Sequence, residues 1–242
     1  MAVKIGSARI DENGHAKGGK AGDQTGKEVS TQNWYLHSKG WRVLRCLDPQ
    51  RAKLIADDMQ YGCDNKHIGY DQNQRLTLYN VAKTVGFNCS RVTQNCETDC
   101  SALVRVCCAY AGINVSNFRT SNEANILLKS GYFEEMKGTK YQNSPDYLRR
   151  GDILVTKTQG HTVVVLSNGK YANNPITCNH VIVTGGSVNF REEPKLTCKI
   201  IGIAHEGDVY EYAHEFIDSK WYKIKFGYEY GYISSKYSNL SP

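Results

Sequence analysis

The sequence predicts an α+β region followed by a small all-β barrel. In the first 184 residues, helical patterns come first and β-rich runs later, which is an α+β order. From Val181 onward, four or five short alternating strands with regularly spaced turns indicate a barrel of about 60 residues. We therefore expect one domain over residues 1–180 and a second over residues 185–242.

Four helices are predicted from their boundary residues. The first opens at Asp48-Pro49, because proline suits the first turn of a helix. The third begins at Thr98-Asp99, where the aspartate can cap the helix, and ends at Gly112. The other two are expected from about Leu76 to Val85, before Gly86, and from Asn122 to Lys129.

The predicted strands of the first domain follow Pro145. They are the runs RRGDILVTK, HTVVVLS and KYANN, separated by turn signals at Gly151 and Asn168-Gly169. By contrast, residues 1–45 are expected to form a glycine-rich loop and then an extended aromatic segment. Trp34, Tyr35 and Trp41 predict that this segment folds against the domain.

Composition excludes several classes of protein. The glycines near residues 18–26 fit neither the dinucleotide-binding nor the P-loop spacing. The net charge of +6 is scattered rather than gathered on one face, so we expect no nucleic-acid partner. No apolar run reaches the roughly 20 residues that span a bilayer, and no secretory signal is visible at the N-terminus. We expect synthesis in a cytoplasm, no membrane insertion and a monomer.

The nine cysteines predict neither a disulfide framework nor a metal site. Their number is odd, and no signal peptide points to an oxidising compartment. No C-x-x-C pair occurs, and Cys96 and Cys100 have no matching His or Cys pair nearby for zinc. Most of these thiols are expected to be small buried groups. No cofactor is predicted.

Cys100 is the predicted nucleophile. It follows Asp99 at the first turn of a predicted helix, where unpaired N–H groups and the helix dipole favour an anion and lower a thiol's pKa. A thiolate nucleophile needs a base, and His161 leads an apolar strand directly after Gly160. His180, near the domain boundary, is the one rival for that role.

The strings TDCSALV, RGDILV and GHTVVVLSNGKYAN resemble the NlpC/p60 branch of the papain-like cysteine peptidases, which cleave peptidoglycan peptides. The resemblance covers roughly residues 85–175, and its specificity comes from the three motifs occurring together in this order. It implies Cys100 as nucleophile, His161 as base and a polar third residue twelve positions later, which is Asn173. It also implies that Asp99 and Ser101 contact substrate. The related CHAP amidase/endopeptidase group has the same order of Cys, His and polar residue, and it remains an alternative.

Strand geometry gives two alternatives for the third residue. A three-residue hairpin loop at Ser167–Gly169 pairs Val163 with Asn173, so that Asn173 and His161 share a face of the sheet. A two-residue loop places Asn174 on that face instead. The family spacing favours Asn173.

The sequence departs from the family pattern at two places. The residues before the nucleophile read RVTQNCE rather than a Tyr- and Gly-rich stretch, and residues 1–70 have no counterpart in the minimal family domain. We expect residues 1–70 to pack on the catalytic domain. Their loop offers Asp23 and Gln24 as substrate contacts, with Gln24 as a candidate oxyanion donor because papain-like enzymes often use a glutamine there.

The C-terminal region resembles a bacterial SH3 domain. SVNFREEP at residues 187–194 looks like the opening of that domain, and later strands fit around Val209, Trp221 and Ile233. We expect these three side chains to lie in its core. Such modules often anchor enzymes of this kind to the cell wall, which implies peptidoglycan as the partner.

The two resemblances together predict a peptidoglycan hydrolase of the endolysin or autolysin type. The favoured reaction is cleavage of the stem peptide next to D-glutamate through an acyl-enzyme on Cys100. The alternatives are a CHAP-type N-acetylmuramoyl-L-alanine amidase, a non-catalytic wall-binding protein, and a papain-like enzyme acting on host proteins. A wall-targeting tail without a signal peptide suggests an endolysin released through a holin, or another export without a signal.

Overall fold

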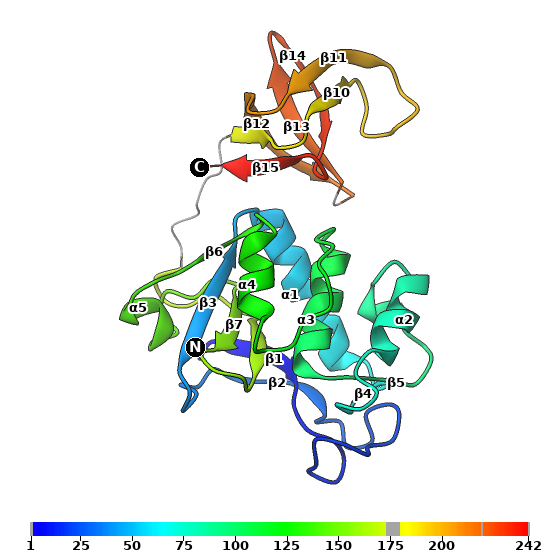
Figure 1. Cartoon of the computed structure of the whole chain (residues 1–242), viewed down its shortest axis with the longest axis vertical. Coiled ribbons are helices and arrows are strands. Elements are labelled where there is room, and N and C mark those ends of the chain that lie inside the picture. Colours follow the sequence, from blue (N-terminus) through cyan, green and yellow to red (C-terminus); the bar gives the residue numbers. More distant parts are fainter. Residues whose placement is uncertain (1, 173–179, 219, 242) are drawn as a thin grey trace. The chain divides into compact units, whose positions relative to one another are not determined.

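The computed structural model describes residues 2–172, 180–218 and 220–241 (Figure 1). The chain divides into two compact units. The first comprises Met1–Cys46 and Ala52–Asn174, and the second comprises Leu47–Arg51 and Pro175–Pro242. Each unit is described by itself.

A six-stranded antiparallel sheet forms the centre of the first unit, in the order β2-β1-β8-β7-β3-β6. Its strands are β1 (Lys4–Ala8), β2 (Val29–Asn33), β3 (Trp41–Cys46), β6 (Phe133–Glu135), β7 (Ile153–Thr156) and β8 (Thr162–Val165). A separate parallel pair joins β4 (Ile68–Tyr70) to β5 (Cys96–Thr98). The unit is α+β, as the sequence predicts.

The four predicted helices are all present. They are α1 (Pro49–Asp64), α2 (Thr77–Thr84), α3 (Cys100–Tyr110) and α4 (Glu123–Lys129), joined by the short α5 (Thr139–Gln142) and the 3-10 turn η1 (Cys89–Arg91). Asp48 caps α1 by accepting from the N–H groups of Gln50 and Arg51. Gly86 and Gly112 follow α2 and α3 with positive φ angles, which ends each helix as predicted.

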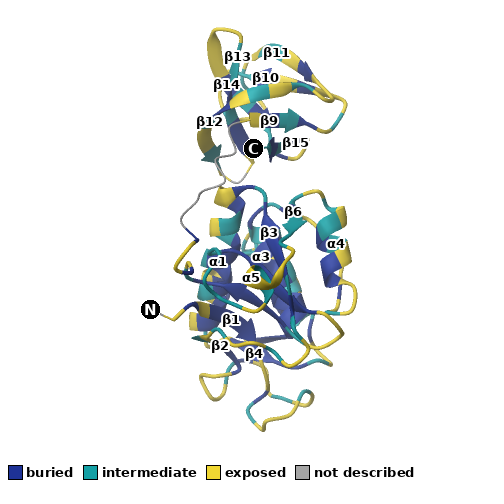
Figure 2. Cartoon of the chain, turned by 90° about the vertical axis from the view of Figure 1, so that its left-hand side faces the viewer, coloured by how far each residue is buried: buried dark blue, intermediate teal, exposed yellow. Residues whose placement is uncertain are grey.

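The central sheet is buried on both faces (Figure 2). One face carries Leu44, Ile153 and Val164 into a core that also contains Ile55 of α1 and Leu103 of α3. The alternate residues of the same strands point to a second core on the other face. That second core contains Val43, Leu154 and Val163 together with Trp41, Val3 and Ile5. Burial on both faces explains why these strands are apolar almost throughout.

The N-terminal segment is more regular than the sequence suggests. Instead of a loop followed by an extended stretch, it supplies β1, β2 and β3, so strands also precede the helices. β1 lies between β2 and β8, where Gly6 is aligned with both Thr31 and Val164. The glycine-rich residues between β1 and β2 form a largely exposed loop.

The predicted strand KYANN is wrong for its described residues. Lys170, Tyr171 and Ala172 lie in a turn whose N–H groups bond to Asp146 and Gly169. β8 pairs with β1 on one edge and with β7 on the other, so neither edge is open to a returning strand. Ser167 and Lys170 therefore do not form a two-residue hairpin at Asn168-Gly169. Val163 is aligned with Leu154 of β7, and its predicted partner Asn173 lies outside the described residues.

The second unit is all-β, consistent with an SH3-like domain. Its seven-stranded sheet has the order β11-β10-β14-β13-β12-β9-β15. The strands are β9 (His180–Val183), β10 (Ser187–Arg191), β11 (Ile200–His205), β12 (Val209–Ile217), β13 (Trp221–Phe226), β14 (Glu229–Ser234) and β15 (Ser238–Ser241). Trp221 and Ile233 are buried as predicted, whereas Val209 is 55% exposed at the start of β12 and does not belong to the core.

Candidate active site

Cys100 is the first residue of α3, and the chain around it explains why the helix starts there. Asp99 has an extended backbone, and its carboxylate accepts a 2.7 Å hydrogen bond from the N–H of Ala102 and a 2.9 Å bond from the Ser101 hydroxyl. This capping fixes the first turn of the helix. The predicted nucleophile therefore lies at a rigid helix N-terminus.

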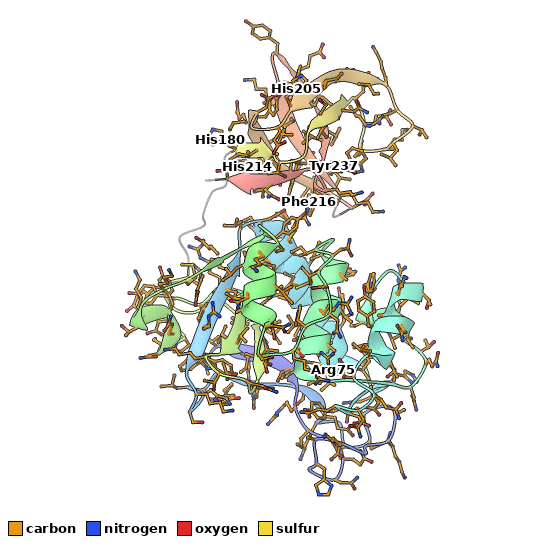
Figure 3. All side chains as sticks on the ribbon, in the orientation of Figure 1. Arg75, His180, His205, His214, Phe216 and Tyr237 are labelled. Carbon is orange, nitrogen blue, oxygen red and sulfur yellow. The ribbon has the colours of Figure 1, made fainter. Side chains whose placement is uncertain are left out.

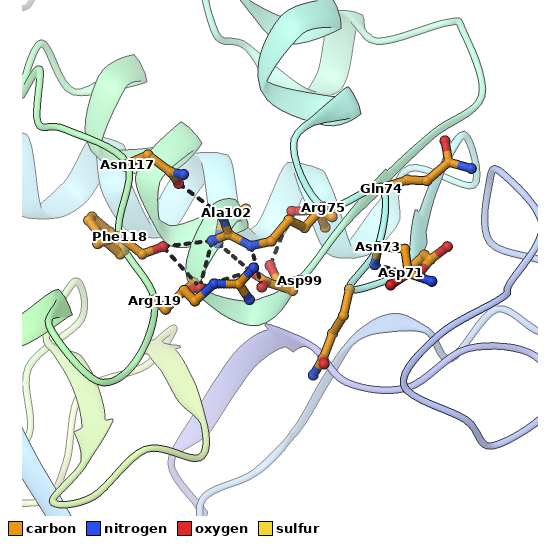
Figure 4. A network of polar contacts seen from close by, with 12 residues as sticks. Asp71, Asn73, Gln74, Arg75, Asp99, Ala102, Asn117, Phe118 and Arg119 are labelled. Carbon is orange, nitrogen blue, oxygen red and sulfur yellow. Dashed lines mark hydrogen bonds and ion pairs between the residues drawn. The ribbon is translucent and has the colours of Figure 1, made fainter.

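Arg75 anchors this first turn through hydrogen bonds from its guanidinium group (Figure 4). Its Nε donates to Asp99, and its Nη2 donates to the Ser101 hydroxyl at 2.9 Å and to the Phe118 carbonyl at 2.6 Å. Its Nη1 donates to the Asn117 side chain at 2.9 Å. Figure 3 labels Arg75 beside the lower end of α3. The arginine thus joins the start of α3 to the loop around Asn117.

Asp99 and Ser101 flank the predicted nucleophile and are buried. The two residues are 4% and 2% exposed, and their polar atoms face Arg75 and the helix backbone. The sequence assigns them to substrate contact, but side chains so enclosed and so fully bonded do not face an open cleft. Their bonds fix the first turn of α3, in which Cys100 lies.

His161 lies at the start of a strand of the central sheet. It directly precedes β8, and its N–H donates to the Thr156 hydroxyl at 2.9 Å, which fixes the turn between β7 and β8. α3 packs against β8, and the Cys100 sulfur accepts a hydrogen bond from the backbone N–H of Thr162. The thiol therefore lies beside the residue that follows His161. In the part of the chain that the structure describes, no hydrogen bond joins the thiol to the imidazole ring.

The two groups are both neutral in the free protein. Burial, and then the nearby carboxylates of Asp99 and Glu123, raise the pKa of the Cys100 thiol despite the N–H groups that it accepts from. The sequence predicts a lowered pKa for this thiol. That prediction is wrong because desolvation of the thiolate outweighs the stabilisation that the helix N-terminus gives it. Burial, followed by the positive charges of His37 and Arg9, lowers the pKa of His161 to about 4. A neutral imidazole can accept the thiol's proton.

A cavity of about 480 Å³ opens beside His161. The residues that line it are Arg9, Ile10, Gln32, Tyr35, His37 and His161. Gln32 is hydrogen-bonded to the Tyr35 hydroxyl, and Tyr35 is close enough to Cys100 for their charges to interact. All the lining residues except His161 come from the N-terminal 37 residues. The sequence pattern marks this segment as aromatic and packed, but does not identify these side chains.

The side chains of Asp23 and Gln24 form hydrogen bonds within their own loop. The Asp23 carboxylate accepts from the N–H groups of Gly26 and Thr25 at 2.7 and 3.1 Å. The Gln24 amide donates to the carbonyls of Ala21 and Gly22 at 3.1 and 3.2 Å. Gln32, and not Gln24, is the glutamine that lines the cavity beside His161.

The remaining predicted residues are placed as follows. Asn173 and Asn174 lie outside the described residues. His180 begins β9 in the second unit and is exposed (Figure 3). No group of three or more His, Cys, Asp or Glu side chains within residues 2–172, 180–218 and 220–241 is arranged to hold a metal ion. No helix in these ranges is long and apolar enough to cross a membrane.

Comparison with known families gives two matches that together cover most of the chain. A family model described as an endolysin-like domain matches residues 5–172, and one described as a bacterial SH3 domain matches residues 186–239. The first match includes β1, β2 and β3, so the N-terminal segment is part of that family's domain. No curated protein matches the chain. The two domains are those of a lytic enzyme that acts on the cell wall, and the chain belongs to the endolysin-like family, with a bacterial SH3 domain at its C-terminal end.

Proposed function

We propose that the protein hydrolyses an amide bond of the peptidoglycan stem peptide, with Cys100 as nucleophile and His161 as general base. The observation that carries this proposal is the hydrogen bond from the Thr162 N–H to the Cys100 sulfur. It joins the first residue of α3 to the first residue of β8, which directly follows His161. The match to the endolysin-like family supports the cell wall as the site of action.

The reaction begins from the neutral pair. His161 takes the thiol proton as the sulfur attacks the scissile carbonyl, and the resulting imidazolium then protonates the leaving amine. Water, activated by the same imidazole, hydrolyses the thioester and releases the free acid and the thiol. The backbone N–H of Cys100 and the amide of Gln32, which lines the cavity beside His161, are our candidates for holding the oxyanion.

The favoured bond is the one that follows D-glutamate, as in the NlpC/p60 peptidases that the motifs resemble. The alternative is the N-acetylmuramoyl–L-alanine bond, which a CHAP-type amidase would cleave. The SH3 domain supports a role in holding the enzyme on the wall. We expect a monomer, with Asn173 orienting the imidazole.

Clearing of purified Gram-positive sacculi tests the nucleophile and the base. We expect wild type to clear the sacculi and Cys100→Ala and His161→Ala not to do so. Cys198→Ala is the matched control, because Cys198 is a half-exposed thiol of the second unit. Clearing by Cys100→Ala at the wild-type rate would refute the assigned nucleophile.

Mass spectrometry of the released fragments identifies the bond. New D-glutamate carboxyl ends would support the endopeptidase, and free L-alanine amino ends would support the amidase. If wild type bound the sacculi and released no fragment, the non-catalytic wall-binding protein would replace our proposal.

A further inference from the structure

A second cavity, of about 420 Å³, lies near the start of α3. Arg75 lines it, and the same guanidinium is bonded to Asp99 and Ser101, the two neighbours of Cys100 in the sequence. Gln72 also lines it, and its amide donates to the Tyr70 hydroxyl at 3.1 Å. Tyr70 is in turn close enough to Cys100 for their charges to interact. The cavity is therefore linked through Arg75 and Tyr70 to the residues around Cys100.

The lining of this cavity is polar, and its only charged members are cations. Gln72, Asn73, Gln74 and Asn117 contribute amides, and Arg75 and Arg119 contribute guanidinium groups. Neither nearby carboxylate lines it. Asp99 is paired with Arg75, and Asp71 is 2% exposed and accepts from the N–H of Asn73. Such a surface favours an anionic group with hydrogen-bond acceptors.

The two arginines differ in how their guanidinium groups are bonded. Arg75 uses all three of its nitrogens within the protein, on Asp99, Asn117, Ser101 and Phe118. Arg119 is exposed, and among the described residues its guanidinium has no hydrogen-bond or ion-pair partner. Figure 4 shows its side chain extending from its loop toward Arg75. Arg119 is thus the cation that is available to a ligand.

The loop that carries Arg119 is anchored by two hydrogen bonds, one on each side of that residue. On one side, the Phe118 carbonyl accepts from Arg75, which holds the start of α3. On the other side, the Thr120 hydroxyl accepts from the N–H of Gly160, the residue before His161, at 3.1 Å. The backbone of Arg119 is therefore held between one anchor that leads to the start of α3 and another that leads to His161. The loop itself then needs little ordering when Arg119 binds a charged group.

We propose that this cavity is a carboxylate-binding subsite in which Arg119 reads a free carboxylate of the stem peptide close to the scissile bond. The inference rests on the proposed function for its substrate. The group could be the α-carboxylate of γ-linked D-glutamate or the side-chain carboxylate of a diamino acid, and the chemistry of recognition is the same. The subsite distinguishes each free acid from the corresponding amide, because a neutral carboxamide forfeits the charge-assisted bond.

Peptide binding to the inactive Cys100→Ala protein tests the subsite separately from catalysis. The probes are three muramoyl tripeptides, N-acetylmuramoyl-L-Ala-γ-D-Glu-diaminopimelate. One has free carboxylates, one is amidated at glutamate and one is amidated at the diaminopimelate side chain. We expect one amidation to weaken binding by about tenfold or more in calorimetry. The amidation that does so identifies the source of the carboxylate.

Variants at position 119 assign the effect to its residue. Arg119→Gln should lose the preference for the free acid, and Arg119→Lys should retain part of it. Lys83→Gln removes one exposed charge from α2 and should leave the preference unchanged. Equal affinity for all three peptides, no detectable binding of the free acid, or a preference that survives Arg119→Gln would each overturn the subsite. Turnover of the same peptides by the wild-type protein separately tests the proposed function.

Discussion

Arg75 donates to the carboxylate of Asp99 in a buried ion pair in which the two side chains are 5% and 6% exposed. Because Asp99 caps the helix that begins with Cys100, the pair determines where the proposed nucleophile lies. Arg75 also reaches Ser101 and the loop of Phe118. The start of α3 is therefore supported by a cation that never faces the cavity beside His161.

Arg75→Ala should destabilise the protein and abolish hydrolysis. Removal of one partner from a buried ion pair leaves an uncompensated charge, which costs about 3–5 kcal/mol. Denaturant unfolding measures the free energy, and fragment release from sacculi measures activity. Arg91→Ala is the control, since Arg91 is exposed at η1. Unchanged stability in Arg75→Ala would show that Asp99 does not depend on this partner.

The pH dependence of hydrolysis should reflect the lowered pKa of His161. Its imidazole must be neutral to accept the thiol proton, and burial lowers its pKa to about 4 from an ordinary value of 6.5. The acid limb of kcat/KM is therefore expected well below pH 6.5. A limb at pH 6.5 in wild type would contradict the burial of the catalytic base.

A substitution at His37 should move that limb. His37 lines the same cavity, and its positive charge contributes to the low pKa of His161. His37→Asn removes this charge, so the acid limb should move to higher pH. His15→Asn is the matched control, because His15 lies in the exposed loop between β1 and β2. An equal shift in both variants would exclude a local effect of His37.

Glu97 should make the folded protein less stable as the pH rises. It is 1% exposed, neither of its carboxyl oxygens has a hydrogen-bond partner among the described residues, and burial, then Glu28 and Asp71, raise its pKa to about 8. The folded state therefore keeps a proton that the unfolded chain loses above about pH 4.5. Its contribution is complete below that pH and is lost as the pH rises to about 8.

Glu97→Gln should accordingly stabilise the protein at alkaline pH. The amide has a similar shape and cannot ionise, so we expect a gain of about 1–2 kcal/mol near pH 9 and little gain near pH 5. Thermal unfolding at both pH values measures the difference. Glu134→Gln in β6 is the control for loss of a carboxylate. A variant that is less stable than wild type at pH 9 would show that the ionised side chain has a partner.

The sequence allowed the nucleophile's helix to be predicted because its signals are local. A capping aspartate, a periodic apolar run and a terminal glycine all lie within residues 98–112, and α3 occupies that range. The strands β1 and β2 have no such signal, since KIGSA and VSTQN mix small and polar residues. They become strands by pairing with each other and with β8, far along the chain.

The cavity beside His161 could not be predicted for the same reason. Gln32, Tyr35 and His37 reach His161 because β1 carries the N-terminal segment to the edge of β8. Such long-range pairing depends on the register of the strands. A single sequence specifies register weakly where apolar and polar residues do not alternate along a strand. The predicted hairpin failed because local turn propensity at Asn168-Gly169 says nothing about which edges of β8 are already occupied.

Gly169 distinguishes the observed turn from that hairpin. In the structure its N–H donates to the Leu148 carbonyl at 2.9 Å, and a Cβ atom at this position would overlap the carbonyl oxygens of Pro145 and Asp146. Neither backbone oxygen can move aside without disturbing the chain before β7, so Gly169→Ala should cost several kcal/mol, on the order of 2–4.

In an exposed hairpin loop, the same substitution would cost only about 1 kcal/mol, the ordinary price of a left-handed conformation for alanine. Denaturant unfolding separates the two values. Lys170→Ala, at the exposed neighbouring position, controls for the loss of a side chain from the turn. A cost near 1 kcal/mol for Gly169→Ala would mean that residues 167–172 do not pack against residues 145–148. A larger cost would establish the packed turn that leads the chain away from β8.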